Sequence, residues 1–286
     1  MKLLVFGQTG QLARELVACC PEGVVLQSLP RADADLMDPA ACAALIAATD
    51  ADAVINATAY TAVDKAETDV GPALMVNATT PTAMAKAAAE RGLPFLHIST
   101  DYVFDGAGDQ PFAPDHPSAP LGAYGRSKLA GEVGIRAAGG PHMILRTSWV
   151  VSAHGANFVK TMLRLGAERD ALSVVADQIG GPTPAADLAR ALHVIAAKMV
   201  AGLPGGTYHF AGAPDTSWAD FAREIMIRAG LDCVITDIPS SAYPTPARRP
   251  LNSRLDCATL IRDFGIERPD WHIGLQSILD DLKGGA

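Results

Sequence analysis

Tyr124 and Lys128 stand four residues apart in the stretch "LGAYGRSKLAGE". On an α-helix, residues i and i+4 lie on one face, so the phenol and the ammonium can point at the same spot. A tyrosine with a pKa of about 10 is a poor acid at neutral pH, and a neighbouring ammonium lowers that pKa because it favours the phenolate. The pair could therefore transfer a proton. The alternative is an ordinary amphipathic helix in which Tyr124 packs and Lys128 is solvated.

Small polar residues follow two predicted strands ahead of this helix, in "NATAYTAVDKAE" and "STDYVFDG". Ser99 and Thr100 could hydrogen-bond the local turn or donate to a substrate oxygen. If a nicotinamide delivers hydride to a ketone, Tyr124 can give a proton to the resulting alkoxide while Thr100 supports the same oxygen. The residue types thus favour hydride chemistry.

The stretch "FGQTGQLA" places Gly7 and Gly10 between the first predicted strand and the first predicted helix. Glycines there allow a tight turn and the close approach of a pyrophosphate, which the helix N-terminus attracts. Ala13 replaces the third glycine of the dinucleotide fingerprint and is small enough for close contact between helix and strand. The position of this turn predicts a dinucleotide site.

The second predicted strand ends in "LQSLPRAD", without an acidic residue at its tip. Arg31 could bind the 2′-phosphate of NADPH or be a solvated surface charge, so NADPH or NADH both remain open. Asp35 and Leu36 could cover the adenine, although Asp35 could equally cap the next helix.

The elements that must position these residues alternate from the first residue onward. Strand-like runs at 2–7, 24–29, 52–59, 94–100 and 142–151 alternate with helical stretches at 11–20, 39–49 and 70–92 and with the helix that carries Tyr124. This alternation predicts an α/β fold with a doubly wound, Rossmann-like parallel sheet. We expect a dinucleotide-binding domain at 1–150, completed by about 182–212, and a smaller, mostly helical substrate-binding lobe at 151–181 and 213–286.

Composition limits the other possibilities. The net charge of −8 argues against a nucleic-acid partner, and no apolar run approaches the length of a membrane span. The N-terminus begins like a secretory signal but meets Gly7 before an apolar run of signal length, so we predict a strand and a cytoplasmic protein. The five cysteines are odd in number and show no CxxC spacing, which indicates reduced, structural thiols.

Eight stretches in order along nearly the whole chain resemble the dTDP-4-dehydrorhamnose reductases, a branch of the extended short-chain dehydrogenase/reductases. They are "FGQTGQL", "NATAYTAVDKAE", "HISTDYVFDG", "YGRSKLAGE", "RTSWVV", "NFVKTMLRL", "DQIGGPT" and "AYPTPARRPLNSRLD". The resemblance implies NAD(P)H-dependent reduction of the 4-keto group of dTDP-4-dehydro-L-rhamnose to dTDP-L-rhamnose, the last step of that sugar nucleotide's synthesis.

The family roles fall on particular residues of this chain. The resemblance implies catalysis by Thr100, Tyr124 and Lys128, of which the last two also contact the cofactor, and a sugar site that includes Asp101 and Trp149. Further cofactor contacts implied by the resemblance are Gly10, Gln11, Leu12, Asp35, Leu36, Ala59 and Thr61.

Two features bear on the rest of the site. Some family members dimerise around magnesium held by glutamates, but only Glu15 matches, because Ala186 takes the second position and aspartates of "LDDL" the third. We therefore expect no metal, and a homodimer stays open. In the C-terminal loop, Arg249 could neutralise the diphosphate of the dTDP-sugar, and Arg248 less so. Otherwise they form a surface pair, or one ties the loop to an acidic helix.

Two alternatives use the same fold. One is another nucleotide-sugar reductase or epimerase with the same catalytic set. The other is a non-catalytic, dinucleotide-binding regulatory subunit similar to that of methionine adenosyltransferase. Trp149 favours the reductase, because an aromatic platform for a deoxysugar serves turnover and is not needed to bind a cofactor alone.

Overall fold

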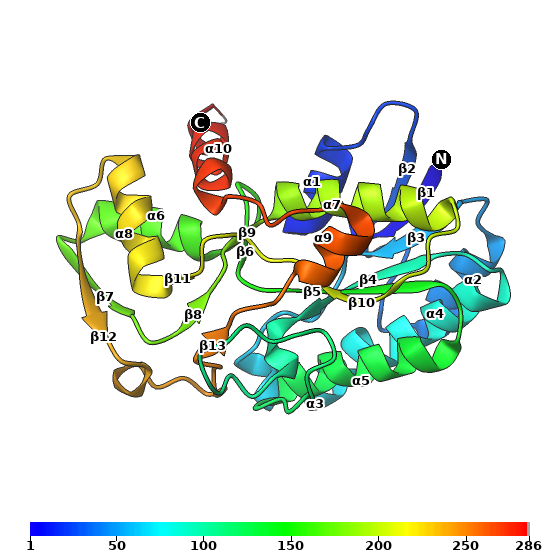
Figure 1. The fold of residues 1–286 in the computed structure, drawn as a ribbon, viewed down its shortest axis with the longest axis horizontal. Coiled ribbons are helices and arrows are strands. Elements are labelled where there is room, and N and C mark those ends of the chain that lie inside the picture. The colour runs from blue at the N-terminus through cyan, green and yellow to red at the C-terminus, as the bar shows by residue number, and fades with distance from the viewer. Residues whose placement is uncertain (285–286) are drawn as a thin grey trace.

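A large lobe built on one parallel sheet and a smaller lobe make up the computed structural model, which describes residues 1–284 (Figure 1). The sheet has the strand order β2-β1-β3-β4-β5-β10, and all neighbouring strands are parallel. Its strands are β1 (Lys2–Phe6), β2 (Val25–Leu29), β3 (Ala53–Asn56), β4 (Phe95–Thr100), β5 (His142–Thr147) and β10 (Gly206–His209). The predicted doubly wound sheet is confirmed, and its strand order reverses between β1 and β3, where ligands of such sheets bind.

Strand β1 shows why the sheet is covered on both faces. Successive strand residues point to opposite faces. Leu3 and Val5 accordingly pack in one core, and Leu4 and Phe6 pack in another. The first core lies under α1 (Gln11–Ala18), α7 (Ala185–Val200) and α9 (Ala258–Phe264), and the second under α2 (Pro39–Ala48), α4 (Thr80–Glu90) and α5 (Ala123–Ala138) (Figure 1).

The smaller lobe has its own core, in which Phe221, Leu275 and Trp271 are buried. Its helices are α6 (Phe158–Glu168), α8 (Trp218–Ala229) and α10 (Trp271–Gly284). The lobe also contains short strands: β6 (Val150–Val151), β7 (Ala171–Val175), β8 (Ile179–Gly180), β9 (Thr183–Pro184), β11 (Thr216–Ser217), β12 (Val234–Ile238) and β13 (Asn252–Ser253). Helices supply much of the core of this lobe, with short strands and loops between them. The sequence did not indicate β12, which is largely exposed and pairs with β7.

The bounds of the two predicted domains remain a prediction. Helix α7 and strand β10, from 182–212, belong to the layers of the large lobe. Leu260 and Phe264 of α9 also pack there, although they come from the C-terminal segment. Along residues 1–284, no helix is long and apolar enough to cross a lipid bilayer.

Candidate active site

The turn after β1 has the geometry that the glycine spacing predicts. Gly7 has φ +116°, a region that side chains rarely adopt, and a Cβ there would lie 3.0 Å from Thr58 Cγ2 and 3.4 Å from Ala13 Cβ. Glycine at position 7 and a small residue at position 13 are therefore both needed for α1 to sit closely against the sheet.

The N-terminus of α1 lies at the sheet edge where the strand order reverses. Gly10 is its N-cap residue, no side chain caps the helix, and a Cβ on Gly10 would meet no atom within 4 Å. An uncapped helix N-terminus leaves backbone N–H groups free for an anion such as a pyrophosphate. Leu12 is buried. Gln11 Oε1 accepts hydrogen bonds from Ser152 Oγ (3.0 Å) and Asn157 Nδ2 (2.9 Å), which links this turn to the start of α6.

Arg31 and Asp35 lie beyond the end of β2. The Arg31 side chain is 81% exposed, and its guanidinium is 3.4 Å from the Asp35 carboxylate. Asp35 does not cap α2, because Asp38 does so by accepting from the backbone N of Ala41 at 3.0 Å. Leu36 is buried, and its carbonyl accepts from the hydroxyl of Thr80 at 2.6 Å.

The loop after β3 carries Ala59 and Thr61, both exposed. Asn77 fixes this loop, because its Oδ1 accepts from the backbone N of Tyr60 (2.9 Å) and its Nδ2 donates to the carbonyl of Tyr60 (3.1 Å) and to Ser127 Oγ (3.0 Å). Asn77 lies in a π-helical turn, Met75–Thr79, that joins α3 (Val70–Leu74) to α4. The single helix predicted at 70–92 is thus interrupted where it ties the loop to α5, and π-turns are frequent at functional sites.

Helix α5 begins at Ala123, directly before Tyr124, and residues distant in sequence fix this start. Glu67 Oε1 accepts from the backbone N of Ala123 at 2.7 Å and so replaces the side-chain cap that Gly122 cannot supply. A Cβ on Gly125 would lie 2.2 Å from the carbonyl oxygen of Tyr102. The glycine therefore lets α5 approach the 3₁₀ turn Asp101–Val103 that follows Thr100.

Tyr124 and Thr100 meet at the end of β4. Burial raises the pKa of the Tyr124 phenol above its ordinary value of 10, and a side-chain hydrogen bond with Thr100 lowers it less. The expectation that Lys128 lowers this pKa is wrong for this structure, because Lys128 does not contribute to it and burial dominates. Tyr124 consequently stays protonated at neutral pH, the form in which a phenol donates a proton.

Lys128 is only 1% exposed, which rules out the solvated lysine of an ordinary amphipathic helix. Its Nζ donates to the carbonyl of Ile98 at 2.6 Å and lies 3.1 Å from His97 Nε2. Burial lowers the pKa of Lys128 to about 8, and the charge of Glu132 opposes this. A buried lysine on the same helix face as Tyr124 is typical of a functional site.

Asp101 and Trp149, the two residues expected at the sugar site, both lie near Ser253. Asp101 is 3% exposed, and burial raises the pKa of its carboxyl to about 6 against hydrogen bonds that include those of Ser253 and Thr100. Trp149 has φ +51°, uncommon for a bulky residue, and its ring stacks on Trp218 at 3.6 Å between centroids. A Cβ on Gly180 would lie 3.0 Å from both the Trp149 ring and Ser253 Cβ, so the glycine lets these two residues pack close together.

Arg249 reaches the site from the C-terminal loop. Its Nη2 donates to Asp64 Oδ2 at 2.7 Å, and its Nη1 donates to the hydroxyl of Tyr102 at 3.3 Å. The Tyr102 ring in turn meets the Tyr124 ring edge to face, with centroids 5.5 Å apart. Arg249 therefore ties the loop to Asp64, which precedes the short 3₁₀ helix Lys65–Glu67, close to the alternative in which an arginine ties the loop to an acidic helix. It does so beside Tyr124, whereas Arg248 is exposed.

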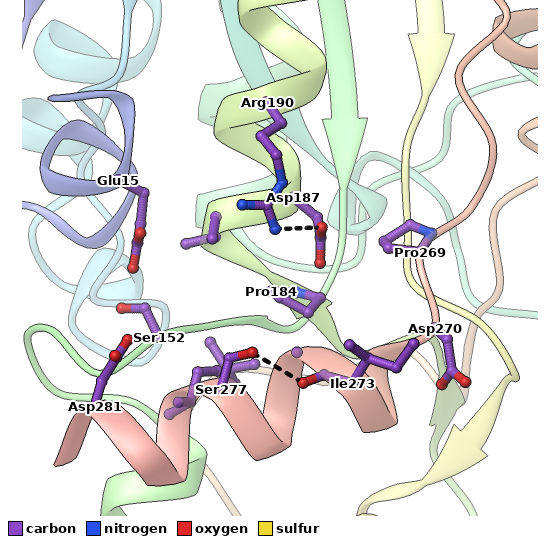
Figure 2. Close-up of a pocket in the computed structure, with 15 residues that line it drawn as sticks. Glu15, Ser152, Pro184, Asp187, Arg190, Pro269, Asp270, Ile273, Ser277 and Asp281 are labelled. Atoms are coloured by element: carbon purple, nitrogen blue, oxygen red, sulfur yellow. Dashed lines mark hydrogen bonds and ion pairs between the residues drawn. The ribbon is translucent and has the colours of Figure 1, made fainter. Parts of the chain in front are cut away.

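A separate pocket lies between α1, the start of α7 and α10 (Figure 2). It brings together Glu15, Ala186 and Asp281, the positions compared above with the magnesium ligands of some family members. Ala186 offers no ligand, and Arg190 donates to Asp187 at 2.8 Å within the pocket (Figure 2). Residues 1–284 contain no group of three or more His, Cys, Asp or Glu side chains that could hold a metal ion. These side chains do not fit a magnesium site.

The amino-acid sequence of the chain is similar to that of known proteins over nearly its whole length. Residues 1–283 match the family described as "RmlD substrate binding domain". The dTDP-4-dehydrorhamnose reductase of Sinorhizobium fredii is 44% identical over 278 residues, which cover 95% of this chain and 94% of that protein.

The chain belongs to the dTDP-4-dehydrorhamnose reductase family.

Solved structures of this family agree with the fold. A dTDP-4-dehydrorhamnose reductase from Clostridium acetobutylicum superposes with a TM-score of 0.92 at 37% identity, covering 99% of this chain and 100% of that one. The enzyme from Bacillus anthracis, solved in complex with NADP, has a TM-score of 0.91 at 32% identity, covering 98% of this chain and 99% of that one.

Sequence reasoning missed several residues that shape the site. They are His97, Glu67, Asn77, Tyr102, Trp218 and Ser253. Glu67 caps a helix that begins 56 residues later in the chain, and no local pattern reveals such a contact. Tyr102 and His97, by contrast, stand within the quoted "HISTDYVFDG", so their closeness to Thr100 could have marked them.

Proposed function

We propose that this protein catalyses the NAD(P)H-dependent reduction of the 4-keto group of dTDP-4-dehydro-L-rhamnose to dTDP-L-rhamnose. The observation that carries the proposal is the meeting of Tyr124 with Thr100 at the carboxyl end of β4, one helical turn from a buried Lys128. A proton donor, an oxygen-supporting hydroxyl and a cation at the ligand-binding edge of a parallel sheet suit ketone reduction.

A nicotinamide dinucleotide fits the described turn after β1. The uncapped N-terminus of α1 and the open space at Gly10 would hold its pyrophosphate, and the loop of Ala59 and Thr61 borders the same edge. Arg31 is 81% exposed and holds Asp35 only at 3.4 Å, so it would exchange this contact for a 2′-phosphate, which favours NADPH. The bound cofactor supplies the hydride.

The chain's own residues supply the rest of the chemistry. Tyr124 donates its proton to the oxygen of the former ketone, and Thr100 hydrogen-bonds the same oxygen. Lys128, buried one helical turn behind Tyr124, completes this proton-transfer site. Trp149 would shape the deoxysugar pocket, and Arg249 would neutralise the diphosphate if it exchanges Asp64 for phosphate oxygens.

The test is a coupled assay with the purified protein. dTDP-4-keto-6-deoxy-D-glucose, a 3,5-epimerase and NADPH or NADH are mixed with the protein, the loss of absorbance of the reduced cofactor is followed, and the product is identified. Formation of dTDP-L-rhamnose is expected. Tyr124→Phe should reduce kcat by about 10²–10⁴-fold while cofactor binding is retained. A variant within twofold of wild type would remove Tyr124 from its role.

The alternatives predict other outcomes of the same assay. Another nucleotide-sugar reductase or epimerase would give a different product or act on a different sugar, and a regulatory subunit would bind the cofactor without oxidising it. A homodimer and a cytoplasmic location stay predictions from the sequence.

A further inference from the structure

His97 lies directly behind Lys128 and is buried in the sheet. The Lys128 Nζ is 3.1 Å from His97 Nε2 and donates to the carbonyl of Ile98 at 2.6 Å. The charge of Glu132, one turn further along α5, raises the pKa of Lys128, and the charge of Lys128 lowers the pKa of His97 on β4. His97 is 0% exposed, and burial together with the charge of Lys128 holds its pKa well below the ordinary value of 6.5. The imidazole is therefore neutral.

The chain of contacts continues into β3. Asn56 is the register partner of His97 in the parallel pair of β3 and β4, and it is also 0% exposed. His97 Nδ1 is 3.1 Å from Asn56 Nδ2. Asn56 Oδ1 accepts from the backbone N of Thr58 at 3.1 Å and from the Thr58 hydroxyl at 2.6 Å.

The backbone N–H of Thr58 fixes which atom donates and which accepts in each of these hydrogen bonds. A backbone N–H can only donate, so the Asn56 oxygen must face Thr58 and the Asn56 NH₂ group must face His97. An amide NH₂ group also only donates, so His97 Nδ1 must accept. A neutral imidazole then carries its single proton on Nε2, which faces Lys128.

The protonation state of Lys128 decides whether the donors and acceptors in this series of hydrogen bonds match. An ammonium has three donors and no acceptor, so it would meet the Nε2–H of His97 donor to donor. A neutral amine has a lone pair that accepts this hydrogen, while its own hydrogens still reach the carbonyl of Ile98. The only other tautomer of His97 would set its Nδ1–H against the NH₂ group of Asn56.

We propose that His97 and Asn56 are positioning residues that stabilise Lys128 as a neutral amine and so make its ammonium a readier proton donor. This inference rests on the proposed reduction, in which Tyr124 loses a proton to the substrate oxygen in each turnover. The phenolate regains a proton when an N–H bond of the Lys128 ammonium breaks and the O–H bond of Tyr124 forms again. The amine left behind takes a proton from a solvent water, which is released as hydroxide, so that each turnover consumes one proton from the solvent.

A second buried histidine provides a contrast. His193 on α7 is 3% exposed, its Nε2 lies 2.9 Å from the carbonyl of Leu16, and burial lowers its pKa. It bridges two helices, and its pKa is set by burial and by the hydrogen bond to the Leu16 carbonyl rather than by a charged neighbour. His97 differs because its neighbour is the lysine beside the reacting tyrosine.

The test measures the titration of Lys128 in two Asn56 variants. Asn56→Leu removes the NH₂ group without adding charge, which frees His97 to carry its proton on Nδ1 and to accept from the ammonium through Nε2. Asn56→Asp goes further, because a carboxylate accepts the Nδ1–H directly and adds a negative charge. The pKa of Lys128 should rise in both variants, and more in Asn56→Asp.

Two measurements report this rise. The alkaline limb of the kcat–pH profile should move upward by about one pH unit or more in Asn56→Leu, the size of one net hydrogen bond expressed as a pKa. The free energy of unfolding, measured in denaturant from pH 7 to pH 10, should rise less steeply with pH than in wild type, because the folded lysine keeps its proton longer. His193→Asn should change neither pH dependence.

Unchanged pH dependence in both Asn56 variants would overturn the inference and leave His97 as a packing residue. A shift in Asn56→Asp alone would also overturn it, since charge would then suffice without the hydrogen-bond chain. The unfolding measurement needs no turnover. It therefore separates failure of this inference from failure of the proposed function, which the assay of wild-type protein reports.

Discussion

Lys128 and Glu132 are buried charges one turn apart on the same face of α5, yet their surroundings are opposite. Glu132 is 0% exposed and accepts from Arg146 Nε (2.9 Å), Arg146 Nη2 (2.6 Å) and the hydroxyl of Ser99 (2.6 Å). Lys128 has a neutral carbonyl and a neutral imidazole as its hydrogen-bond partners. One charge is neutralised by a buried ion pair, and the other is not.

The pKa values of the two groups show the consequence. Burial raises the pKa of Glu132, but the hydrogen bond and charge of Arg146 outweigh burial, so that the carboxyl remains ionised. Burial lowers the pKa of Lys128 to about 8, and the charge of Glu132 offsets only part of this lowering. A buried charge with a full set of partners keeps its proton state and supports the fold, whereas a buried charge without an ionic partner can change its proton state near neutral pH.

The largest expected effect comes from removing the uncompensated charge. Lys128→Met should lower kcat by about 10²–10⁴-fold, the range of general acid–base contributions. It should leave the free energy of unfolding unchanged or higher, because a buried cation without an ionic partner destabilises the fold. Steady-state kinetics and urea unfolding measure the two quantities. Lys86→Met, on the exposed side of α4, is the matched control and should alter neither.

If Lys128→Met instead lost stability without losing turnover, Lys128 would support the fold just as Glu132 does, and the contrast between the two residues would disappear.

Removing Arg146, the ion-pair partner of Glu132, should instead lower the free energy of unfolding. Arg146→Met removes two hydrogen bonds to the buried Glu132 carboxylate and leaves it only Ser99 and the partly exposed Arg136 at 3.3 Å, so the expected loss approaches the about 3–5 kcal/mol of unfolding free energy that breaking a buried ion pair typically costs. The double variant Arg146→Met with Glu132→Gln should recover much of this loss, since the carboxylate that lost its partner is then removed as well. Denaturant unfolding of the single and double variants measures both effects.

The control for this prediction is an exposed ion pair. Arg164 lies 3.2 Å from Glu168, with both side chains more than half exposed, so Arg164→Met should cost about 0–1 kcal/mol. An Arg146→Met protein no less stable than this control would contradict the importance of the buried pair.

The pH dependence of stability should separate the two residues again, with a smaller effect. The pKa of Glu132 is lowered on folding, so its stabilising contribution is complete above its ordinary pKa of 4.5 and is lost as pH falls through the folded value. The pKa of Lys128 is also lowered, so the unfolded chain binds more protons between about 8 and 10.5, and stability rises with pH in that window.

Difference curves test this prediction. Unfolding free energies are measured from pH 3.5 to pH 10 for wild type, Lys128→Met and the Arg146→Met, Glu132→Gln double variant. The alkaline rise should weaken only in Lys128→Met, and the acid loss only in the double variant. The same alkaline slope in wild type and Lys128→Met would mean that Lys128 titrates normally.

The sequence predicted much of the site because its residues are local to strand ends. Gly7, Gly10 and Thr100 follow buried strands, and Tyr124 and Lys128 follow helical spacing, so periodicity places them. The partners that set their protonation could not be placed this way. His97 and Asn56 are neighbours through sheet register, and Glu67 caps α5 across 56 residues, so these contacts exist only once the chain has folded. The expected lowering of the Tyr124 pKa failed for the same reason, because burial, which sequence spacing does not report, outweighs it.

The smallest expected effect on stability comes from removing the exposed charge of Arg31. Arg31 is 81% exposed and 3.4 Å from Asp35 at the end of β2, so its pair contributes about 0–1 kcal/mol to folding. Arg31→Ala should hardly change the free energy of unfolding. Because a guanidinium there can bind a 2′-phosphate, the variant should instead lower kcat/KM for NADPH relative to NADH. Arg14→Ala, on the first turns of α1 and exposed, is a control for loss of positive charge near the site. If kcat/KM of wild type strongly favours NADH, or if Arg31→Ala leaves the ratio between the two cofactors unchanged, Arg31 does not read the phosphate and is a solvated surface charge.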